Sequence, residues 1–175
     1  PDGAMINPAA EEECDEIDNN CNDEVDEGVG NTYYYDGDND TYGGSNTQVA
    51  CSPPDNYREL GGDCDDSDAE VYPGAAYRET DESACMKDSD EDGYGDTSPF
   101  NSNVTAGTDC DDEAAKAFPT AAENEADPSA CMLDDDDDGY GDENPQNTNV
   151  AAGTDCDDAE ATIFPNATID ATNGE

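Results

Sequence analysis

Histidine and tryptophan are absent from this sequence, and only four lysines and arginines occur among its 175 residues. Without histidine, the chain lacks the commonest general acid–base side chain and a nitrogen ligand that softer metals prefer. The few basic residues stand against 49 aspartates and glutamates, which excludes a nucleic-acid-binding surface because phosphates would be repelled. No stretch of the sequence is apolar enough to span a membrane.

Large apolar residues are also scarce, since the hydrophobic content reaches 33% only when alanine, cysteine and tyrosine are counted. Such a composition, with a net charge of −45, is by itself typical of disorder, and cations must offset the charge in any compact fold. Eight cysteines argue for a fold, because disulfides and metals are the usual substitutes for a hydrophobic core. Disulfides indicate an oxidising compartment, so we expect an extracellular or cell-surface protein.

The acidic residues follow a pattern: the motif D-x-D-x-D-G-Y-G-D begins at Asp88 and again 46 residues later at Asp134. A short loop wraps Ca²⁺ with oxygen ligands at positions 1, 3 and 5, a backbone carbonyl at 7 and a carboxylate at 9. Glycine at position 6 permits the sharp turn with positive φ. One such motif arises easily in so acidic a chain, but two extended copies at a fixed period favour calcium loops. The expected ligands are Asp88, Asp90, Asp92, the carbonyl of Tyr94 and Asp96 in one copy, and Asp134, Asp136, Asp138, the carbonyl of Tyr140 and Asp142 in the other.

Two further copies of the loop are weaker. One has Thr41 in place of the glycine and Gly44 in place of the last aspartate. The other begins at Asp18 and follows the pattern more loosely. The expected ligands are Asp36, Asp38, Asp40 and the carbonyl of Tyr42 in the first, and Asp18, Asn20, Asn22, Glu24 and Asp26 in the second.

A tandem repeat organises the chain, because the unit G-x-D-C-D-D recurs every 46 residues and an aromatic–proline pair follows each copy. The repeat divides the chain into a long first unit at 1–62, full units at 63–108 and 109–154, and a partial unit at 155–175. Repeats of this size form extended arrays in which each unit contacts its neighbours.

Glycine, aspartate, asparagine and proline dominate the sequence, so loops should carry the structure. We expect an irregular, small-β fold class, a loop-rich rod held by Ca²⁺ loops and disulfides with little regular secondary structure. Short helical turns are expected at 67–71 and 112–117, each stopped by the following proline. Short strands are expected at 32–35 and around Val104 and Val150. The tyrosine of each loop should pack with the aromatic residue that precedes a proline in the same repeat unit.

The loops lack the bidentate glutamate that closes an EF-hand at position 12, where Pro99 and Pro145 stand instead. The D-C-D-D carboxylates are the obvious donors of the remaining ligands, which would make each calcium join one unit to the next. The alternative is that D-C-D-D only caps a short helix. The expected donors are Asp109, Asp111 and Asp112 for the loop at Asp88, Asp155, Asp157 and Asp158 for the loop at Asp134, and Asp63, Asp65 and Asp66 for the loop at Asp36.

The period also suggests a cysteine pairing, although eight cysteines allow many arrangements. Cys14 and Cys156 lack partners at the expected spacing inside the sequence. We hypothesise that Cys156 of one subunit bonds Cys14 of the next, giving an open head-to-tail filament. The alternative, left open here, is a longer repeat array with both partners on one polypeptide. The suggested pairs are Cys21–Cys51, Cys64–Cys85, Cys110–Cys131 and, between subunits, Cys14–Cys156.

In combination these motifs resemble a known family. G-T-D-C-D-D, P-x-A, E-C-D-x-I-D-N-x-C-x-x-x-V-D-E-G and Y-x-D-x-D-x-x-Y-G are similar to the metal-binding repeats of bacterial surface and secreted proteins, a family named after the methanotroph copper-binding surface protein MopE. The loops also resemble those of thrombospondin type 3 repeats. The resemblance implies an extracellular, calcium-binding, tandem-repeat protein. Copper is not carried over, because histidine and tryptophan are absent.

Three classes of function follow from these observations. The first is structural, an extracellular calcium-binding rod or filament subunit joined head to tail to copies of itself. The second is a binding module, either a calcium-dependent spacer or adhesin segment among flanking repeats or an acidic cation-binding surface protein. The third, an enzyme, is not expected, because nothing marks a shielded cleft. Asn103 and Asn166 begin N-glycosylation sequons, so glycans there are open, the alternative being plain polar loop residues.

Overall fold

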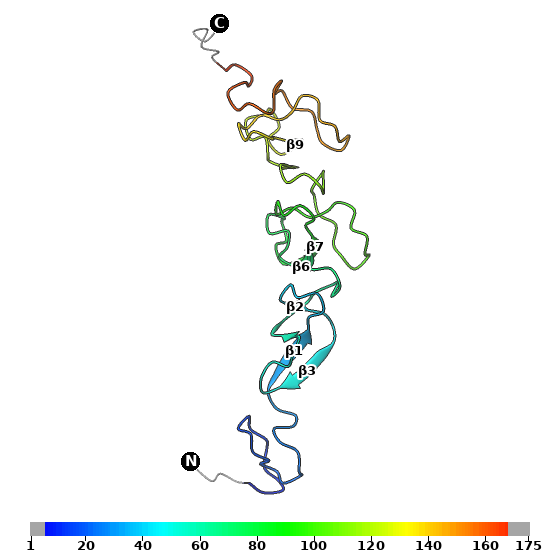
Figure 1. Ribbon diagram of the computed structural model, residues 1–175, viewed down its shortest axis with the longest axis vertical. Helices are drawn as coiled ribbons and strands as arrows, with labels where there is room; N and C mark the ends of the chain where they lie inside the picture. Colours follow the sequence, from blue (N-terminus) through cyan, green and yellow to red (C-terminus); the bar gives the residue numbers. More distant parts are fainter. Residues whose placement is uncertain (1–5, 168–175) are drawn as a thin grey trace. The chain divides into compact units, whose positions relative to one another are not determined.

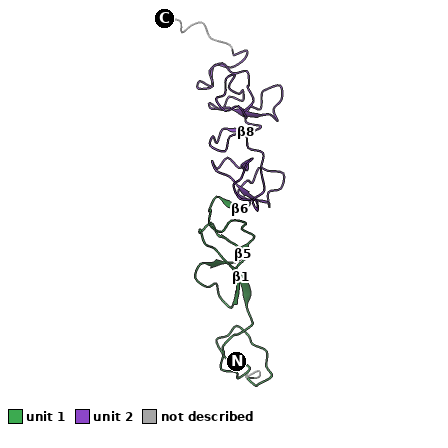
Figure 2. Cartoon of the chain, turned by 90° about the vertical axis from the view of Figure 1, so that its right-hand side faces the viewer, with its two compact units in different colours: residues 1–73 green, residues 74–175 purple. Residues whose placement is uncertain are grey.

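The structure is a computed structural model that describes residues 6–167 (Figure 1). The chain divides into two units, residues 1–73 and residues 74–175 (Figure 2), and each is considered by itself. The described residues contain no helix, and their strands are two to five residues long. The predicted irregular, loop-rich small-β fold is therefore confirmed. None of the described residues forms a helix long and apolar enough to cross a bilayer.

The first unit is built around the tyrosine strand that the sequence predicts. β1 pairs antiparallel with β3 on one side and β4 on the other, with Tyr34 opposite both Thr47 and Arg58. β2 and β5 form a short parallel pair. Threonine and three tyrosines favour the extended backbone of β1, and Tyr33 is buried. The strands of this unit are β1 (Asn31–Tyr35), β2 (Tyr42–Gly43), β3 (Thr47–Ala50), β4 (Tyr57–Arg58), β5 (Leu60–Gly61) and β6 (Val71–Pro73).

The second unit has three named strands, β7 (Cys85–Lys87), β8 (Ala117–Pro119) and β9 (Cys131–Leu133). β8 and β9 pair antiparallel, with Pro119 opposite Cys131. Two isolated parallel bridges join Asp96 to Asp109 and Asp142 to Asp155. These bridges lie at equivalent repeat positions, so the period of the sequence is also a period of the backbone.

The helical turns expected at 67–71 and 112–117 do not form. Each segment makes isolated turns instead, such as Ala117 N–H donating to the Ala114 carbonyl at 2.7 Å. A strand begins directly afterwards at β6 and β8, and its proline has no N–H to continue a helix. The strands expected around Val104 and Val150 are also absent, because both valines are buried in turns.

The apolar core is small and made mostly of alanine, valine and methionine side chains. The largest fully buried side chains are Val71 and three aspartates, Asp36, Asp109 and Asp155. A buried carboxylate without a compensating cation or hydrogen-bond donors is strongly unfavourable. The carboxylates at the centre of this fold therefore need an explanation that a hydrophobic core does not provide.

Each loop tyrosine stacks on an aromatic residue that precedes a proline, but this partner lies in the next repeat unit and not, as expected, in the same one. The ring centroids are 5.5 to 5.6 Å apart and the rings are inclined by 5 to 15°. Offset stacking of this kind contributes roughly 0.5–1.5 kcal/mol per pair beyond area burial. The pairs are Tyr42–Tyr72 in the first unit, and Tyr94–Phe118 and Tyr140–Phe164 in the second.

Candidate metal centres

The three best loop motifs adopt one backbone turn and are called the first, second and third loops, beginning at Asp36, Asp88 and Asp134. Gly93 and Gly139, at position 6, have φ values of +94° and +91°. Thr41 occupies the same position of the degraded loop and has φ of +87°, so the turn survives the loss of glycine. In each loop a carboxylate at position 5 accepts the N–H of the following tyrosine at 2.7 to 2.9 Å. The turn brings together two trios of aspartates, and the D-C-D-D segment completes two more, the oxygen atoms of each trio lying within 4.8 Å of one another. The trios are Asp36–Asp38–Asp40 and Asp88–Asp90–Asp92 within loops, and Asp134–Asp136–Asp158 and Asp136–Asp138–Asp155 with D-C-D-D aspartates.

The first aspartate of each loop is held in place from inside the turn. Asp88 and Asp134 each accept the N–H of the position-6 glycine at 2.9 Å. Asp36 accepts the N–H of Asn39 at 2.7 Å, and its other oxygen, Oδ2, lies 3.0 Å from Nε of Arg58 in place of a position-6 N–H. Arg58 of β4 thus takes over the contact that a backbone N–H makes in the other two loops.

Backbone pairing delivers the D-C-D-D segment to the loop. Asp109 N–H donates to the Gly95 carbonyl at 3.0 Å, and Asp155 N–H donates to the Gly141 carbonyl at 2.8 Å. A Cβ on Gly107, just before the first of these segments, would overlap the Gly95 carbonyl, so this close approach requires glycine. The G-x-D-C-D-D motif therefore joins the loop it follows, and the helix-cap alternative does not apply.

The four positions of D-C-D-D behave differently. The first aspartate is buried in every copy, and the N–H two residues later donates to its Oδ1 at 2.8 to 3.1 Å. The last aspartate accepts a loop N–H, as Asp66 does from Gly37 at 2.7 Å and Asp158 from Asp135 at 3.1 Å. Asp155 and Asp158 both belong to carboxylate trios of the third loop.

The third residue of D-C-D-D contacts the first aspartate through its backbone N–H, and its side chain belongs to none of the carboxylate trios of the described residues. Asp65 Oδ1 accepts the Ser67 hydroxyl at 2.7 Å, and Asp157 is exposed. Asp111 lines a polar cleft with Asn147 and Asn149 rather than joining a carboxylate trio. Sequence reasoning did not separate this position from its neighbours.

Position 9 differs between the two complete loops. Asp96 is buried and accepts both the N–H and the hydroxyl of Ser89, at 3.1 and 2.8 Å. Asp142 instead accepts the N–H of Asn144 at 2.8 Å. Asp96 also raises the pKa of Asp112 through its charge, an effect that adds to burial of Asp112. The last aspartate of each loop therefore stays close to the D-C-D-D segment without belonging to a carboxylate trio.

The electrostatics of the clusters are those of carboxylates crowded away from water. Burial, followed by the charges of neighbouring aspartates, raises the pKa of Asp109 and of Asp158 to about 7. The same causes raise the pKa of Asp40, Asp63 and Asp92 to about 6. A divalent cation would remove the repulsion and return these groups to their charged form.

Many buried carboxylate oxygens in the loops have no hydrogen-bond partner, although the carboxylates are packed closely together. Asp155 is fully buried and its Oδ2 has no donor. Oxygen-only donors at this density fit a hard cation such as Ca²⁺, which takes six to eight of them. The unpartnered oxygens of the loops and D-C-D-D segments are Oδ2 of Asp38, Asp40, Asp63, Asp90, Asp92, Asp136, Asp138 and Asp155, and Oδ1 of Asp88.

The loosest loop, at Asp18, is organised differently. Asp18 accepts the backbone N–H groups of Cys21, Asn22 and Asp23 at 2.6 to 3.2 Å. The carboxylate trios of the described residues include none of the expected ligands of this loop. Asn20 and Asn22 instead donate their side-chain amides to Glu27, which the sequence analysis did not single out.

The disulfides agree with the prediction only in part. Cys110–Cys131 forms as predicted, and Cys64 and Cys85 are both disulfide-bonded. The predicted pairs Cys21–Cys51 and Cys14–Cys156 are wrong, because Cys14 bonds Cys51 within the chain. Cys21 and Cys156 are free and exposed.

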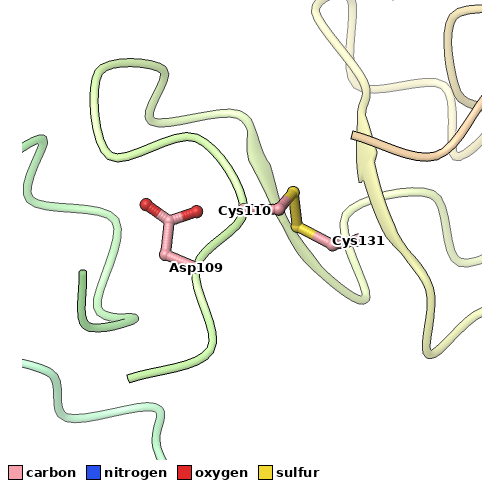
Figure 3. A group of neighbouring side chains, drawn as sticks. All are labelled: Asp109, Cys110 and Cys131. Atoms are coloured by element: carbon pink, nitrogen blue, oxygen red, sulfur yellow. A yellow bond between two sulfur atoms is a disulfide. The ribbon is translucent and has the colours of Figure 1, made fainter. Parts of the chain in front are cut away.

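Asp109 lies close to the Cys110–Cys131 disulfide, but the three residues do not form a metal site. An oxygen of the Asp109 carboxylate and the two sulfur atoms lie within 4.8 Å of one another (Figure 3). Both sulfurs are bound to each other, so neither is the thiolate that a soft metal requires. Asp109 therefore belongs to the contacts of the loop, whereas the neighbouring Cys110 serves only the disulfide.

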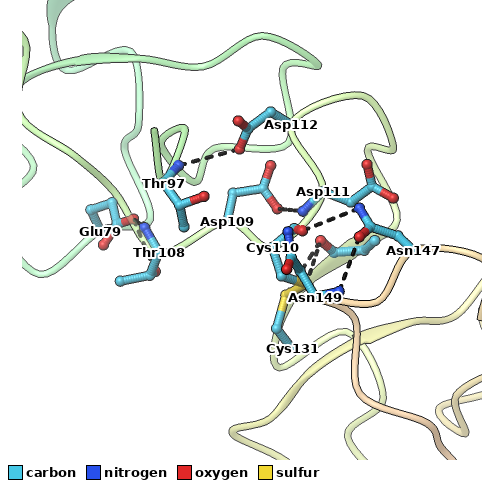
Figure 4. The surroundings of a disulfide bond; sticks show 11 residues. Glu79, Thr97, Thr108, Asp109, Cys110, Asp111, Asp112, Cys131, Asn147 and Asn149 are labelled. Atoms are coloured by element: carbon cyan, nitrogen blue, oxygen red, sulfur yellow. Dashed lines mark hydrogen bonds between the residues drawn. A yellow bond between two sulfur atoms is a disulfide. The ribbon is translucent and has the colours of Figure 1, made fainter. Parts of the chain in front are cut away.

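The sequence analysis did not identify two glutamates that accept hydrogen bonds from residues at the ends of the loops. Glu79 Oε1 accepts the N–H and hydroxyl of Thr108 at 2.5 and 2.9 Å (Figure 4). It also accepts the N–H of Gly95 at 3.3 Å. Glu125 makes the equivalent contacts with Thr154, at 2.6 and 2.8 Å. The two glutamates are 46 residues apart, so the repeat period itself is the signal that identifies them.

A basic residue reaches each of the three loops. Arg58 pairs with Asp36 in the first loop, as described above. Arg78 lies over the Phe118 ring at 5.0 Å, and its charge lowers the pKa of Asp92 against the larger effect of burial. Lys116 donates to Asp137 of the third loop at 2.8 Å. The scarce positive charge is concentrated where the negative charge is densest.

Comparison with known proteins gives one result. Neither curated proteins nor solved structures gave a match. A family model, Cu-binding MopE, described as a "putative metal-binding motif", matches residues 3–27, 63–82, 109–143 and 155–174. These segments make up more than half of the chain and include all three D-C-D-D copies and the third loop. The chain therefore belongs to this family of metal-binding repeat proteins.

Proposed function

We propose that this chain is an extracellular structural protein whose folded state is held together by calcium, and whose copies join head to tail into a filament. The observation that carries the proposal is the burial of Asp155 inside a carboxylate trio and of Asp109 beside the charges of Asp92 and Asp90. Removing charges of one sign from water without a counter-ion costs on the order of several kcal/mol per ion. A fold with this core requires cations as components.

Calcium is favoured over copper by the donor set. The clusters offer carboxylate and carbonyl oxygens, the chain has no histidine, and the disulfide sulfurs are unavailable. Oxygen ligands suit calcium and magnesium, whereas copper sites are built from imidazole, thiolate or thioether. The D-C-D-D carboxylates supply ligands from outside the loop, so a bound ion would fasten two distant segments together. The family name alone does not transfer copper to this chain.

An extracellular location is supported by the disulfides, since reducing compartments rarely keep them. The millimolar calcium of extracellular fluids also suits loops of modest affinity. The proposed role involves no catalytic step.

The test is a calorimetric titration of chelator-treated, non-reduced protein with calcium, with circular dichroism at both end points. We expect saturable binding of about three ions or more, with dissociation constants on the order of 10⁻⁴–10⁻³ M, and a gain of structure. Binding that never saturates and leaves the spectrum unchanged would contradict the proposal. So would tight copper binding that displaces calcium from a variant in which Cys21 and Cys156 are serine.

A further inference from the structure

The second and third loops are two repeats of one site, and they differ in the residue that bonds the carbonyl of the position-6 glycine. Arg78 N–H donates to the Gly93 carbonyl at 2.8 Å, and Asn124 N–H donates to the Gly139 carbonyl at 2.7 Å. Arg78 and Asn124 are 46 residues apart, so they hold the same position of the repeat. Their backbones therefore make the same contact with the loop, while only one of the two side chains is charged.

Two aromatic rings hold the Arg78 guanidinium beside the second loop. Its Cζ lies 5.0 Å from the centre of the Phe118 ring and 5.7 Å from that of the Tyr77 ring. Phe118 in turn stacks on Tyr94, the loop residue whose carbonyl is an expected ligand. Burial raises the pKa of Asp92, and the charge of Arg78 is among the effects that oppose this increase, so the charge reaches the loop carboxylates. An incoming divalent cation would be repelled by the same charge.

Asn124 contacts the same turn of the third loop without a charge. Its side-chain amide donates to the Asp138 carbonyl at 3.1 Å. The next residue position also differs, because the third repeat has the acidic Glu123 where the second has Tyr77. The third loop therefore has a neutral hydrogen bond where the second loop has a fixed positive charge.

The charged residues in and directly beside the two loops, at 87–97 and 133–143, differ in the same direction. Residues 75–118, which include the second loop and its D-C-D-D segment, contain three basic residues, whereas the corresponding residues 121–164 contain none. Lys116 opposes this difference, since it donates to Asp137 of the third loop, but it does so from the exposed rim. The third loop is therefore the more negative of the two. The pairs that differ in charge are Lys87–Leu133, Ser89–Asp135 and Thr97–Glu143.

We propose that Arg78 lowers the calcium affinity of the second loop, so that the third loop fills at lower calcium concentrations than the second. This inference rests on the proposed function, because it assigns an order to calcium sites that the function requires. The consequence is a chain that takes up calcium in steps. At intermediate concentrations, calcium fastens the third loop to its D-C-D-D segment while the second loop has yet to bind its ion.

The experiment titrates the calcium-depleted, non-reduced full chain with calcium and follows the ring signals of Tyr94 and Tyr140 separately by nuclear magnetic resonance. Tyr94→Phe and Tyr140→Phe assign the two signals. At about 0.01 M salt, the Tyr140 signal of the wild type should reach half-saturation at about tenfold less calcium than the Tyr94 signal, corresponding to ~1.4 kcal/mol. At about 1 M salt the difference should nearly disappear, because the screening length falls from about 30 Å to about 3 Å.

Exchange of the two residues between the loops is the matched test. Arg78→Asn should raise the calcium affinity of the second loop about fivefold, and Asn124→Arg should lower that of the third loop by about the same factor. Arg78→Lys, which keeps the charge, should stay within about twofold of the wild type. Both side chains are exposed, so these variants should fold, which circular dichroism of the calcium-loaded proteins checks.

Equal affinities of the two loops in the wild type, or a second loop that fills first, would overturn the proposed order. An effect of Arg78→Asn that persists undiminished in high salt, or that Arg78→Lys reproduces, would overturn the role of the charge and assign Arg78 a packing role instead. Two saturable sites of equal affinity would contradict this inference alone. If neither ring signal shows saturable binding, the proposed function fails together with it.

Discussion

At the scale of single residues, Thr41 occupies a conformation that its side chain resists. Its φ of +87° is close to the values of Gly93 and Gly139 at the same loop position, but threonine is β-branched. A residue keeps such an unfavourable backbone conformation when the structure around it fixes the backbone. Here the loop is fixed on both sides, by β1 ahead of it and by β2 directly after Thr41. The degraded loop therefore keeps its shape at a cost in strain.

Thr41→Gly should relieve that strain and stabilise the calcium-loaded protein by up to about 1 kcal/mol, after allowing for the greater freedom of glycine in the unfolded chain. Thermal unfolding at saturating calcium measures the change. The matched control is Thr80→Gly, at an exposed threonine without positive φ, which should lose stability. If both variants lose stability equally, Thr41 is not strained.

Asp155 and Asp157 are two residues apart but differ sharply in surroundings. Asp155 is fully buried with a free carboxylate oxygen, and Asp157 is exposed. Asp155→Asn should therefore weaken calcium binding at the third loop by at least about tenfold, because one charged ligand becomes neutral. Asp157→Asn should leave the binding isotherm essentially unchanged. Equal losses in the two variants would mean that the whole D-C-D-D segment, rather than its buried first residue, holds the ion.

At the scale of elements, β4 gives the first loop a cation that belongs to the chain. Arg58 lies 3.0 Å from the first aspartate of that loop, and the Asp36 side chain is fully buried. A fixed positive charge at this distance lowers the repulsion in the metal-free loop and also repels an incoming divalent cation. Lys116 contacts the third loop only from its exposed rim, where solvent screens the interaction.

Arg58→Met, which keeps the length of the side chain and removes its charge, should raise the calcium affinity of the first loop by about tenfold. It should also lower the stability of the metal-free protein, because Asp36 stays buried without its partner. Lys116→Met should change the affinity of the third loop far less. Calorimetric titration of the two variants and the wild type measures these affinities. A lower calcium affinity of the first loop in Arg58→Met would show that Arg58 does not compete with calcium for Asp36.

Where a motif repeats, the sequence was enough to predict the local structure, because the same short-range interactions recur. This holds for the three loop turns and for Cys110–Cys131, whereas the rings stack between consecutive repeat units and not within one. The prediction failed where the period was extended to a segment that does not share it. Residues 6–30 are held by their own side chains, such as Glu12, which accepts the N–H groups of Asn20 and Asp26. In that setting Cys14, not Cys21, bonds Cys51.

At the scale of the whole molecule, protons and metal ions compete for the same carboxylates. Burial raises the pKa of Asp109 and Asp158 from the ordinary 3.8 to about 7, and that of Asp40, Asp63 and Asp92 to about 6. Between pH 3.8 and about 7, the folded metal-free chain therefore binds more protons than the unfolded chain. The contribution of these groups to stability is therefore fully present below about pH 4 and is lost as the pH rises through 6 to 7.

Calcium-free protein should accordingly resist urea better at pH 5 than at pH 8. Added calcium should reverse that order, since the metal requires deprotonated carboxylates and binds the folded state. Urea unfolding at the two pH values, each with and without calcium, gives the four free energies needed. A calcium-free protein that gains stability from pH 5 to pH 8 would show that these carboxylates are not crowded in the folded state.

The three stacked ring pairs make the loops optically distinct. Without tryptophan, the near-ultraviolet absorption and emission of the chain come chiefly from its nine tyrosines. Tyr94 and Tyr140 each lie against a phenylalanine, whereas Tyr42 lies against Tyr72, so the first loop alone of the three couples two strong chromophores. A second close tyrosine pair, Tyr35–Tyr57 with ring centroids 5.5 Å apart, directly precedes Asp36 and Arg58 of the same loop. Exciton splitting in the near-ultraviolet dichroism therefore reports on the first loop, and an unlabelled sample can show when this loop fills relative to the other two.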